Sequence, residues 1–155
     1  MEPTTVRLVT GAALAKAPNI AELCVEYTQE SANTDLIGRL PSFDSYFQLE
    51  QAGVAHFFGA YKGDDHLVGF AVLLVTPVLH FAGRLIGTTE SIFVAAEHRP
   101  GGAGMALLRA MEAQARDLGA TGIYVSGPAE GRLVKVLPSV GYKETNRTFY
   151  RGLQS

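Results

Sequence analysis

The chain has 155 residues, 47% of them apolar, and its 13 basic and 15 acidic side chains leave a formal net charge of -2. This length suits one domain with a sizeable core, and the charge argues against a protein that binds nucleic acid through clustered Lys and Arg. The longest apolar stretch, residues 67–75, is far shorter than a membrane span, and residues 1–10 lack the pattern of a signal peptide. We therefore expect a single cytoplasmic domain over residues 1–155, with no nucleic-acid or membrane partner.

The first half of the chain predicts one strand and two helices. Residues 5–10 alternate weakly between apolar and polar side chains, which is typical of a strand. Apolar side chains then recur at helical spacing in two segments, Ile20, Leu23, Cys24 and Tyr27 in the first, Phe43, Tyr46 and Phe47 in the second. The helical phase of Cys24, the single cysteine, favours a core position over an acyl carrier, which would need an activated thiolate.

The second half predicts a hairpin of residues 54–62 and 66–75, a third strand over 84–95 and the clearest helix over 104–118. A short strand at 121–126, a short helix at 129–137 and a final strand at 142–150 complete the order. We expect an α/β fold in which a mixed sheet carries helices on both faces. The exposed final strand could pair with a second copy and make a homodimer.

A glycine-rich turn joins the third strand to the clearest helix. Its residues are Arg99, Pro100, Gly101, Gly102, Ala103, Gly104 and Met105. A helix that begins here directs unpaired N–H groups and the positive end of its dipole at the turn, and glycines let an anion approach the backbone. The pattern is neither a P-loop nor a dinucleotide fingerprint. It predicts a site for phosphate or pyrophosphate, unless the turn only connects the strand to the helix.

These residues resemble the signature of the GNAT acetyltransferases, which is Arg or Gln, two residues, Gly, one residue, then Gly or Ala. Arg99, Gly102 and Gly104 match it, Val94 stands five residues before the Arg as the family's valine does, and the Gly141-Tyr142 step is similar to the family's ending. The resemblance implies a GNAT fold, with a mixed, mostly antiparallel sheet and helices on both faces, and acetyl-CoA as cosubstrate. It implies that backbone groups of Ile92, Phe93 and Val94 pair with the pantetheine arm, and that residues 99–105 hold the pyrophosphate.

Acetyl transfer to an amine requires a base, and Glu90 is the candidate. It lies on the strand of Ile92 and Val94, and the two-residue period of a strand predicts all three on one face. The position of Glu90 is similar to that of the strand carboxylate that several GNAT enzymes use as the base. The alternative is that Glu90 pairs across the sheet or faces solvent.

Two positions depart from the family pattern. Leu137 stands where many members place a tyrosine that protonates the leaving thiolate, and Glu130 replaces an asparagine that contacts the cofactor in some members. Tyr142, Tyr124 or water could take the place of the missing acid. These departures support an alternative function, a catalytically degenerate acyl-CoA-binding module that acts as a sensor or an assembly partner.

The acceptor is left open by the sequence. A small amine, an amino acid, an aminoglycoside or a protein amino terminus would all suit the chemistry. The region that borders the acceptor pocket in this family contains Asp35, Asp44, Glu50 and Tyr46. Acids there would attract a cationic amine, although a solvated helix face explains these residues equally well. The aromatic side chains of 43–47 and 57–58 are expected in the core. His56, His66, His80 and His98 show no metal-site spacing, so no metal is expected.

Overall fold

The computed structural model describes residues 2–30, 33–36 and 40–154. Within them, five strands form one sheet in the order β1-β2-β3-β4-β5. The strands are β1 Thr4–Val9, β2 Ala55–Lys62, β3 His66–Val78, β4 Arg84–Val94 and β5 Gly122–Tyr124. β1 to β4 pair antiparallel, and β5 pairs parallel with β4. The sheet is therefore mixed and mostly antiparallel, as the sequence predicts.

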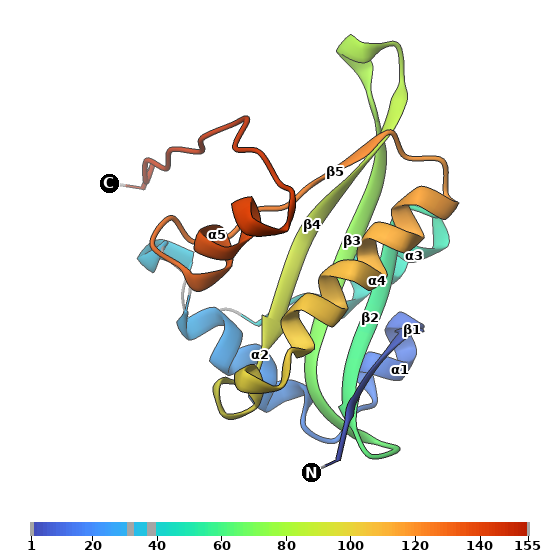
Figure 1. Ribbon diagram of the computed structural model, residues 1–155, viewed down its shortest axis with the longest axis vertical. Coiled ribbons are helices and arrows are strands. Elements are labelled where there is room, and N and C mark those ends of the chain that lie inside the picture. Colours follow the sequence, from blue (N-terminus) through green and yellow to red (C-terminus); the bar gives the residue numbers. More distant parts are fainter. Residues whose placement is uncertain (1, 31–32, 37–39, 155) are drawn as a thin grey trace.

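Helices cover both faces of this sheet (Figure 1). They are α1 Gly11–Ala15, α2 Ile20–Gln29, α3 Phe43–Gln51, α4 Ala103–Asp117 and α5 Arg132–Val136, with short 3-10 helices η1 Thr34–Leu36, η2 Leu79–Phe81, η3 Ala96–Gly101 and η4 Leu137–Val140. The longest, α4, lies across one face, and α1, α2 and α3 lie on the other (Figure 1). None of the helices in the described residues is long and apolar enough to cross a bilayer.

The two faces have separate hydrophobic cores. On the α4 face, Leu107, Leu108 and Met111 are fully buried against β2, β3 and β4. On the other face, side chains of α1 and α2 such as Leu14 and Leu23 pack against aromatic rings of the sheet. Because β3 is covered on both sides, its side chains are apolar in both directions rather than alternating with polar ones.

Cys24 lies in the second core, where it is buried among residues of α2 and the sheet. Burial raises the pKa of its thiol, so the thiolate is disfavoured. The predicted core position is confirmed, and an activated acyl carrier at Cys24 is not supported.

Two local predictions from the sequence are wrong. Thr10 does not extend the first strand; its hydroxyl accepts a hydrogen bond from the Ala13 N–H and caps α1, a helix too short to show a periodic pattern. Residues 142–150 form no strand. The neighbouring strand β5 has only three residues, so it offers little backbone for a further strand to pair with. Polar residues also interrupt the alternation of apolar and polar side chains in residues 142–150. The strand pairing that we expected between two copies therefore has no basis at residues 142–150.

The α4 core provides a direct test of this packing. Leu107 is 0% exposed, whereas Leu118, the same residue type at the C-terminal end of α4, is 38% exposed. We expect Leu107→Ala to lower the free energy of unfolding by about 2–5 kcal/mol, because it leaves a cavity, and Leu118→Ala to lower it by less than about 1 kcal/mol. Urea denaturation followed by circular dichroism measures both. Equal losses in the two variants would contradict the placement of α4.

Candidate active site

The main feature of the site is a separation of β4 from β5. The two strands pair over three residues only, Ile86 with Gly122, Gly87 with Ile123 and Thr88 with Tyr124. One further contact follows, in which the Ser126 N–H donates to Thr89 Oγ1 at 3.2 Å. Beyond it, within the described part of the chain, no strand adjoins this edge of β4, and the two strands diverge (Figure 1). An open sheet edge therefore runs along the second half of β4.

Strand geometry determines which backbone groups face this edge. The Ala95 N–H donates to the Val68 carbonyl at 2.9 Å, on the β3 side. Since backbone groups alternate in direction along a strand, those of Phe93 also face β3, and those of Ile92 and Val94 face the open edge. Phe93 was predicted to contribute to the edge with its two neighbours. Instead its backbone pairs with Phe70 and its ring lies in the core, so that part of the prediction is wrong.

The glycine turn follows at the end of β4. The chain first makes η3, and Gly102 then adopts φ +78°, a left-handed conformation that favours glycine, before α4 begins at Ala103. The first hydrogen bond of α4 runs from the Ala106 N–H to the Gly102 carbonyl at 3.1 Å. The N–H groups of residues 103–105 consequently have no partner within the helix. They form the positive end of α4, suited to an anion.

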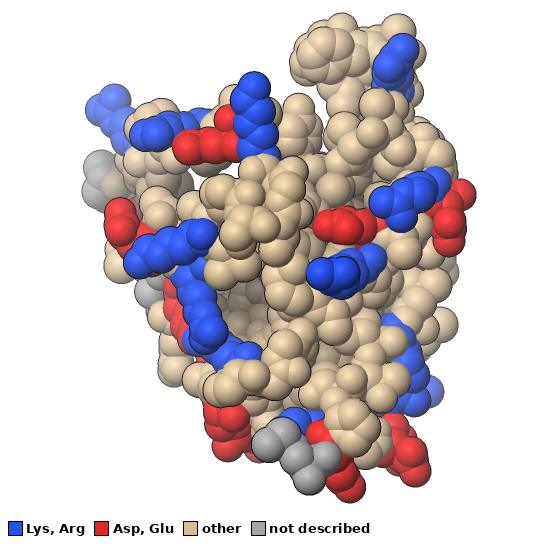
Figure 2. Space-filling model, in the orientation of Figure 1, with Lys and Arg blue, Asp and Glu red and all other residues tan. Residues whose placement is uncertain are grey.

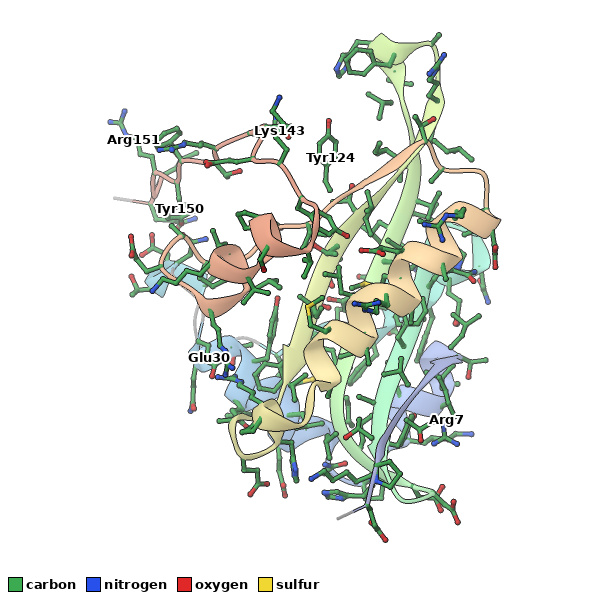
Figure 3. The ribbon with its side chains drawn as sticks, in the orientation of Figure 1. Arg7, Glu30, Tyr124, Lys143, Tyr150 and Arg151 are labelled. Atoms are coloured by element: carbon green, nitrogen blue, oxygen red, sulfur yellow. The ribbon has the colours of Figure 1, made fainter. Side chains whose placement is uncertain are left out.

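Arg99 is directed at the protein rather than at this helix end. Its Nε donates to the Val94 carbonyl at 2.9 Å, and its Nη2 contacts both carboxylate oxygens of Glu30 at 2.6 and 2.7 Å. Figure 3 shows Glu30 at the end of α2 that lies beside η3. Glu26, also on α2, accepts a hydrogen bond from the Ala96 N–H at 3.0 Å. These contacts favour a structural role for Arg99 at the turn over direct contact with an anion.

Glu90 occupies a β-bulge. Val72 pairs with Ser91 and Leu73 pairs with Thr89, so Glu90 is an extra residue in β4. Its carboxylate accepts a hydrogen bond from the Tyr46 hydroxyl of α3 at 2.8 Å. Glu90 therefore lies on the α3 side of the sheet. The predicted shared face with Ile92 and Val94 is wrong, because those two side chains pack on the α4 side and the bulge interrupts the two-residue period.

Two tyrosines keep their protons beside Glu90. Burial raises the pKa of Tyr46, and the hydrogen bond with Glu90 raises it further. Burial also raises the pKa of Tyr27, to which the negative charge of Glu90 adds. Both phenols stay neutral at ordinary pH, so Tyr46 is a stable hydrogen-bond donor that orients the carboxylate.

A mainly apolar pocket lies on the same side of the sheet as Glu90. Phe43, Tyr46 and Phe47 of α3 line it together with Phe57 and Ser91 of the sheet. The sequence pattern assigned the three aromatic side chains of α3 to the core, because helical spacing cannot distinguish a packed face from one that borders a gap. The core position expected for residues 57 and 58 is confirmed, because Phe57 is buried in the core on the α3 side and Phe58 in the core on the α4 face.

The structure describes the two positions that depart from the family pattern and the two tyrosines that could replace the missing acid. Leu137 is buried in the α4-face core and Glu130 is exposed. The Tyr142 hydroxyl donates to Glu112 of α4 at 2.6 Å, and burial and this bond raise its pKa. Tyr124 projects from the end of β5 (Figure 3), where it is exposed. The Tyr142 hydroxyl is thus hydrogen-bonded to α4, and Tyr124 lies where β4 and β5 begin to separate.

The molecular surface agrees with an open cleft. Figure 2 shows a hollow between α5 and η3, bordered by basic side chains. No group of three or more His, Cys, Asp or Glu among the residues described is placed to hold a metal ion.

Comparisons with known proteins match these features. The model of the Acetyltransferase (GNAT) family matches residues 19–133. No sequence among the curated proteins matches the chain.

Solved structures match almost the whole chain at low identity. An aminoglycoside acetyltransferase from an uncultured soil metagenomic sample gives a TM-score of 0.75 at 16% identity, covering 97% of each chain. Ribosomal-protein-alanine N-acetyltransferase from Brucella melitensis biovar Abortus 2308 gives 0.70 at 21% identity, covering 96% of this chain and 97% of that one. Glucosamine-6-phosphate N-acetyltransferase from Arabidopsis thaliana gives 0.72 at 11% identity, covering 99% and 100%.

At these identities the structural matches establish the fold, and the family match spans most of the sequence. This chain belongs to the GNAT acetyltransferase family.

Proposed function

We propose that the protein is an N-acetyltransferase that moves the acetyl group of acetyl-CoA directly to a primary amine of a small molecule or a protein. The observation that carries the proposal is the open edge of β4 next to the unpaired N–H groups at the start of α4. An extended ligand can pair its amides with the open edge of β4 and at the same time place an anionic group at the start of α4. Coenzyme A has both parts.

The open edge accounts for binding of the pantetheine arm. The Val94 N–H and the Ile92 carbonyl are available to its amides, whereas Arg99 already occupies the Val94 carbonyl. The pyrophosphate lies at the turn of Gly102, Ala103, Gly104 and Met105. Arg99, Pro100 and Gly101 support this turn from η3, which the bonds to Glu30 and Val94 hold in place.

Residues on β4 carry the chemistry. The bound cosubstrate supplies the acetyl thioester, whose carbonyl carbon the amine attacks as the C–N bond forms and the C–S bond breaks. Glu90, or a water that it orders, accepts the amine proton, and Tyr46 fixes the carboxylate that does so. The Ile92 N–H, the open-edge donor nearest Glu90, donates to the thioester carbonyl oxygen as negative charge develops there. Water protonates the thiolate, because Leu137 stands at the family's acid position and Tyr142 is bonded to Glu112.

A second candidate is a cofactor-binding module without turnover. Two observations favour it. Leu137 is buried and carries no acid at the position of the family's tyrosine, and the Tyr142 hydroxyl is already hydrogen-bonded to Glu112. The two candidates share the cosubstrate and differ in whether an amine is acetylated.

The turn is tested by calorimetric titration with acetyl-CoA. We expect binding with a Kd on the order of micromolar, in the range usual for enzyme substrates. Gly102→Glu places a carboxylate against the phosphates and should weaken binding by about 100-fold or more. Gly119→Glu is the matched control, because Gly119 also has a positive φ and open space around it but lies at the other end of α4. Native-like binding by Gly102→Glu would overturn the proposed pyrophosphate site.

The base is tested by Glu90→Gln, which keeps the shape of the side chain and removes its charge. The kcat for an accepted amine should fall by about 10²–10⁴-fold, as expected for loss of a general base, with the Kd for acetyl-CoA unchanged. Glu22→Gln, an exposed substitution in the first turn of α2, should leave kcat as it is. Undiminished kcat in Glu90→Gln would exclude Glu90 as the base, and no turnover in the native protein would favour the binding module.

A further inference from the structure

The pocket beside Glu90 has a composition that selects among acceptors. Six of its 13 lining residues are aromatic, namely Tyr27, Phe43, Tyr46, Phe47, Phe57 and Phe70. The other seven are Gly11 and Leu14 of α1, Ile20 and Cys24 of α2, Pro41, Val72 of β3 and Ser91 of β4. An apolar body placed here is removed from water against rings and methyl groups, which stabilises its binding in proportion to the area buried.

The two charged side chains that the structure shows hydrogen-bonded to lining residues of the pocket are both acidic. The Glu90 carboxylate accepts a hydrogen bond from the hydroxyl of the lining residue Tyr46. The Glu50 carboxylate accepts one from the N–H of the lining residue Gly11 at 2.8 Å. Among the lining residues that the structure describes there is no Lys, Arg or His. An ammonium group is therefore attracted, while a carboxylate or a phosphate would find no cationic partner among these described lining residues.

The pocket also adjoins the open edge of β4. Ser91 lines the pocket, and the next residue, Ile92, presents its backbone to the edge. Glu90 precedes them both on the bulge. Because neighbouring Cα atoms are about 3.8 Å apart, an amine held between Glu90 and Ser91 lies within a few ångströms of a group bound along the edge.

We propose that this pocket holds the acceptor and that the acceptor is a small primary monoamine with an aromatic or branched aliphatic body. This inference rests on the proposed N-acetyl transfer and narrows its substrate class. The rings hold the body of the amine, and Glu90 contacts the ammonium group before it takes the proton. A sugar amine is disfavoured, because its hydroxyl groups would lose water in an apolar pocket with few polar partners. An α-amino acid is disfavoured by its carboxylate.

The test measures acetyl transfer from acetyl-CoA, followed by release of free thiol, to a panel of amines. The kcat/KM for 2-phenylethylamine and isoamylamine should exceed that for ethanolamine and glucosamine by about tenfold or more, through burial of the apolar body. Phenylalanine, which adds only a carboxylate to phenylethylamine, should be a poor acceptor. Equal or better rates with the polar amines, with phenylalanine or with a peptide that begins with Phe would overturn the inference.

A matched pair of variants ties the preference to the pocket. Phe43 and Leu49 are both on α3 and both 38% exposed, but only Phe43 lines the pocket. Phe43→Asn should raise the KM for 2-phenylethylamine by about tenfold and leave the KM for ethanolamine within about twofold. Leu49→Asn should change neither, and thermal melting confirms that both variants are folded. The same KM in both variants would overturn the inference.

Calorimetry separates this inference from the proposed function. If the protein does not bind acetyl-CoA, the proposed function fails and the inference fails with it. If acetyl-CoA binds and polar amines are acetylated at least as well as apolar ones, the inference alone fails. Binding of 2-phenylethylamine to the complex with coenzyme A, lost in Phe43→Asn and kept in Leu49→Asn, supports the pocket independently of turnover.

Discussion

The candidate site depends on the early end of the pairing between β4 and β5. β5 stops at Tyr124, and Pro128, which has no N–H to donate to a neighbouring strand, follows four residues later. At the other end of the gap, Arg99 ties the Val94 carbonyl to Glu30 of α2. The second half of β4 is thus held at both ends and lacks a strand neighbour on one side among the described residues, which leaves N–H and carbonyl groups ready to pair with an extended ligand.

The bulge at Glu90 places a carboxylate of β4 on the α3 face of the sheet, next to this open edge. In a regular strand, Glu90 would share the α4 face with Ile92, and the Tyr46 hydroxyl could not reach it. The extra residue directs the carboxylate toward α3 and the aromatic pocket, while Ile92 and Val94 keep their backbone groups on the open edge. An amine that approaches from the pocket and a thioester bound along the edge therefore meet beside the same three residues of β4, Glu90 to Ile92. The proposed mechanism needs no movement of the sheet.

Much of the fold could be predicted from local patterns. The hairpin of β2 and β3, the strand β4 and the helix α4 follow from apolar periodicity, and the glycine turn follows from Arg99, Gly102 and Gly104. Features that depend on distant partners could not be predicted. The pairing of Arg99 with Glu30 joins residues 69 positions apart. The bulge has no glycine or other local signal at Glu90, and the gap beside Phe43 depends on how α3 sits on the sheet. Residues 142–150 carry a weak strand pattern, but β5 is too short to pair with them.

Amide hydrogen exchange of Ile92 and Val94, measured residue by residue by NMR with and without acetyl-CoA, tests the central claim most directly. The N–H groups of both residues face the open edge, whereas that of Phe93 faces β3. The account predicts that saturating acetyl-CoA slows exchange at Ile92, Val94 and the first turn of α4 and leaves Phe93 nearly unchanged. Unchanged exchange at Ile92 and Val94 under saturation would show that the open edge of β4 is not where acetyl-CoA binds.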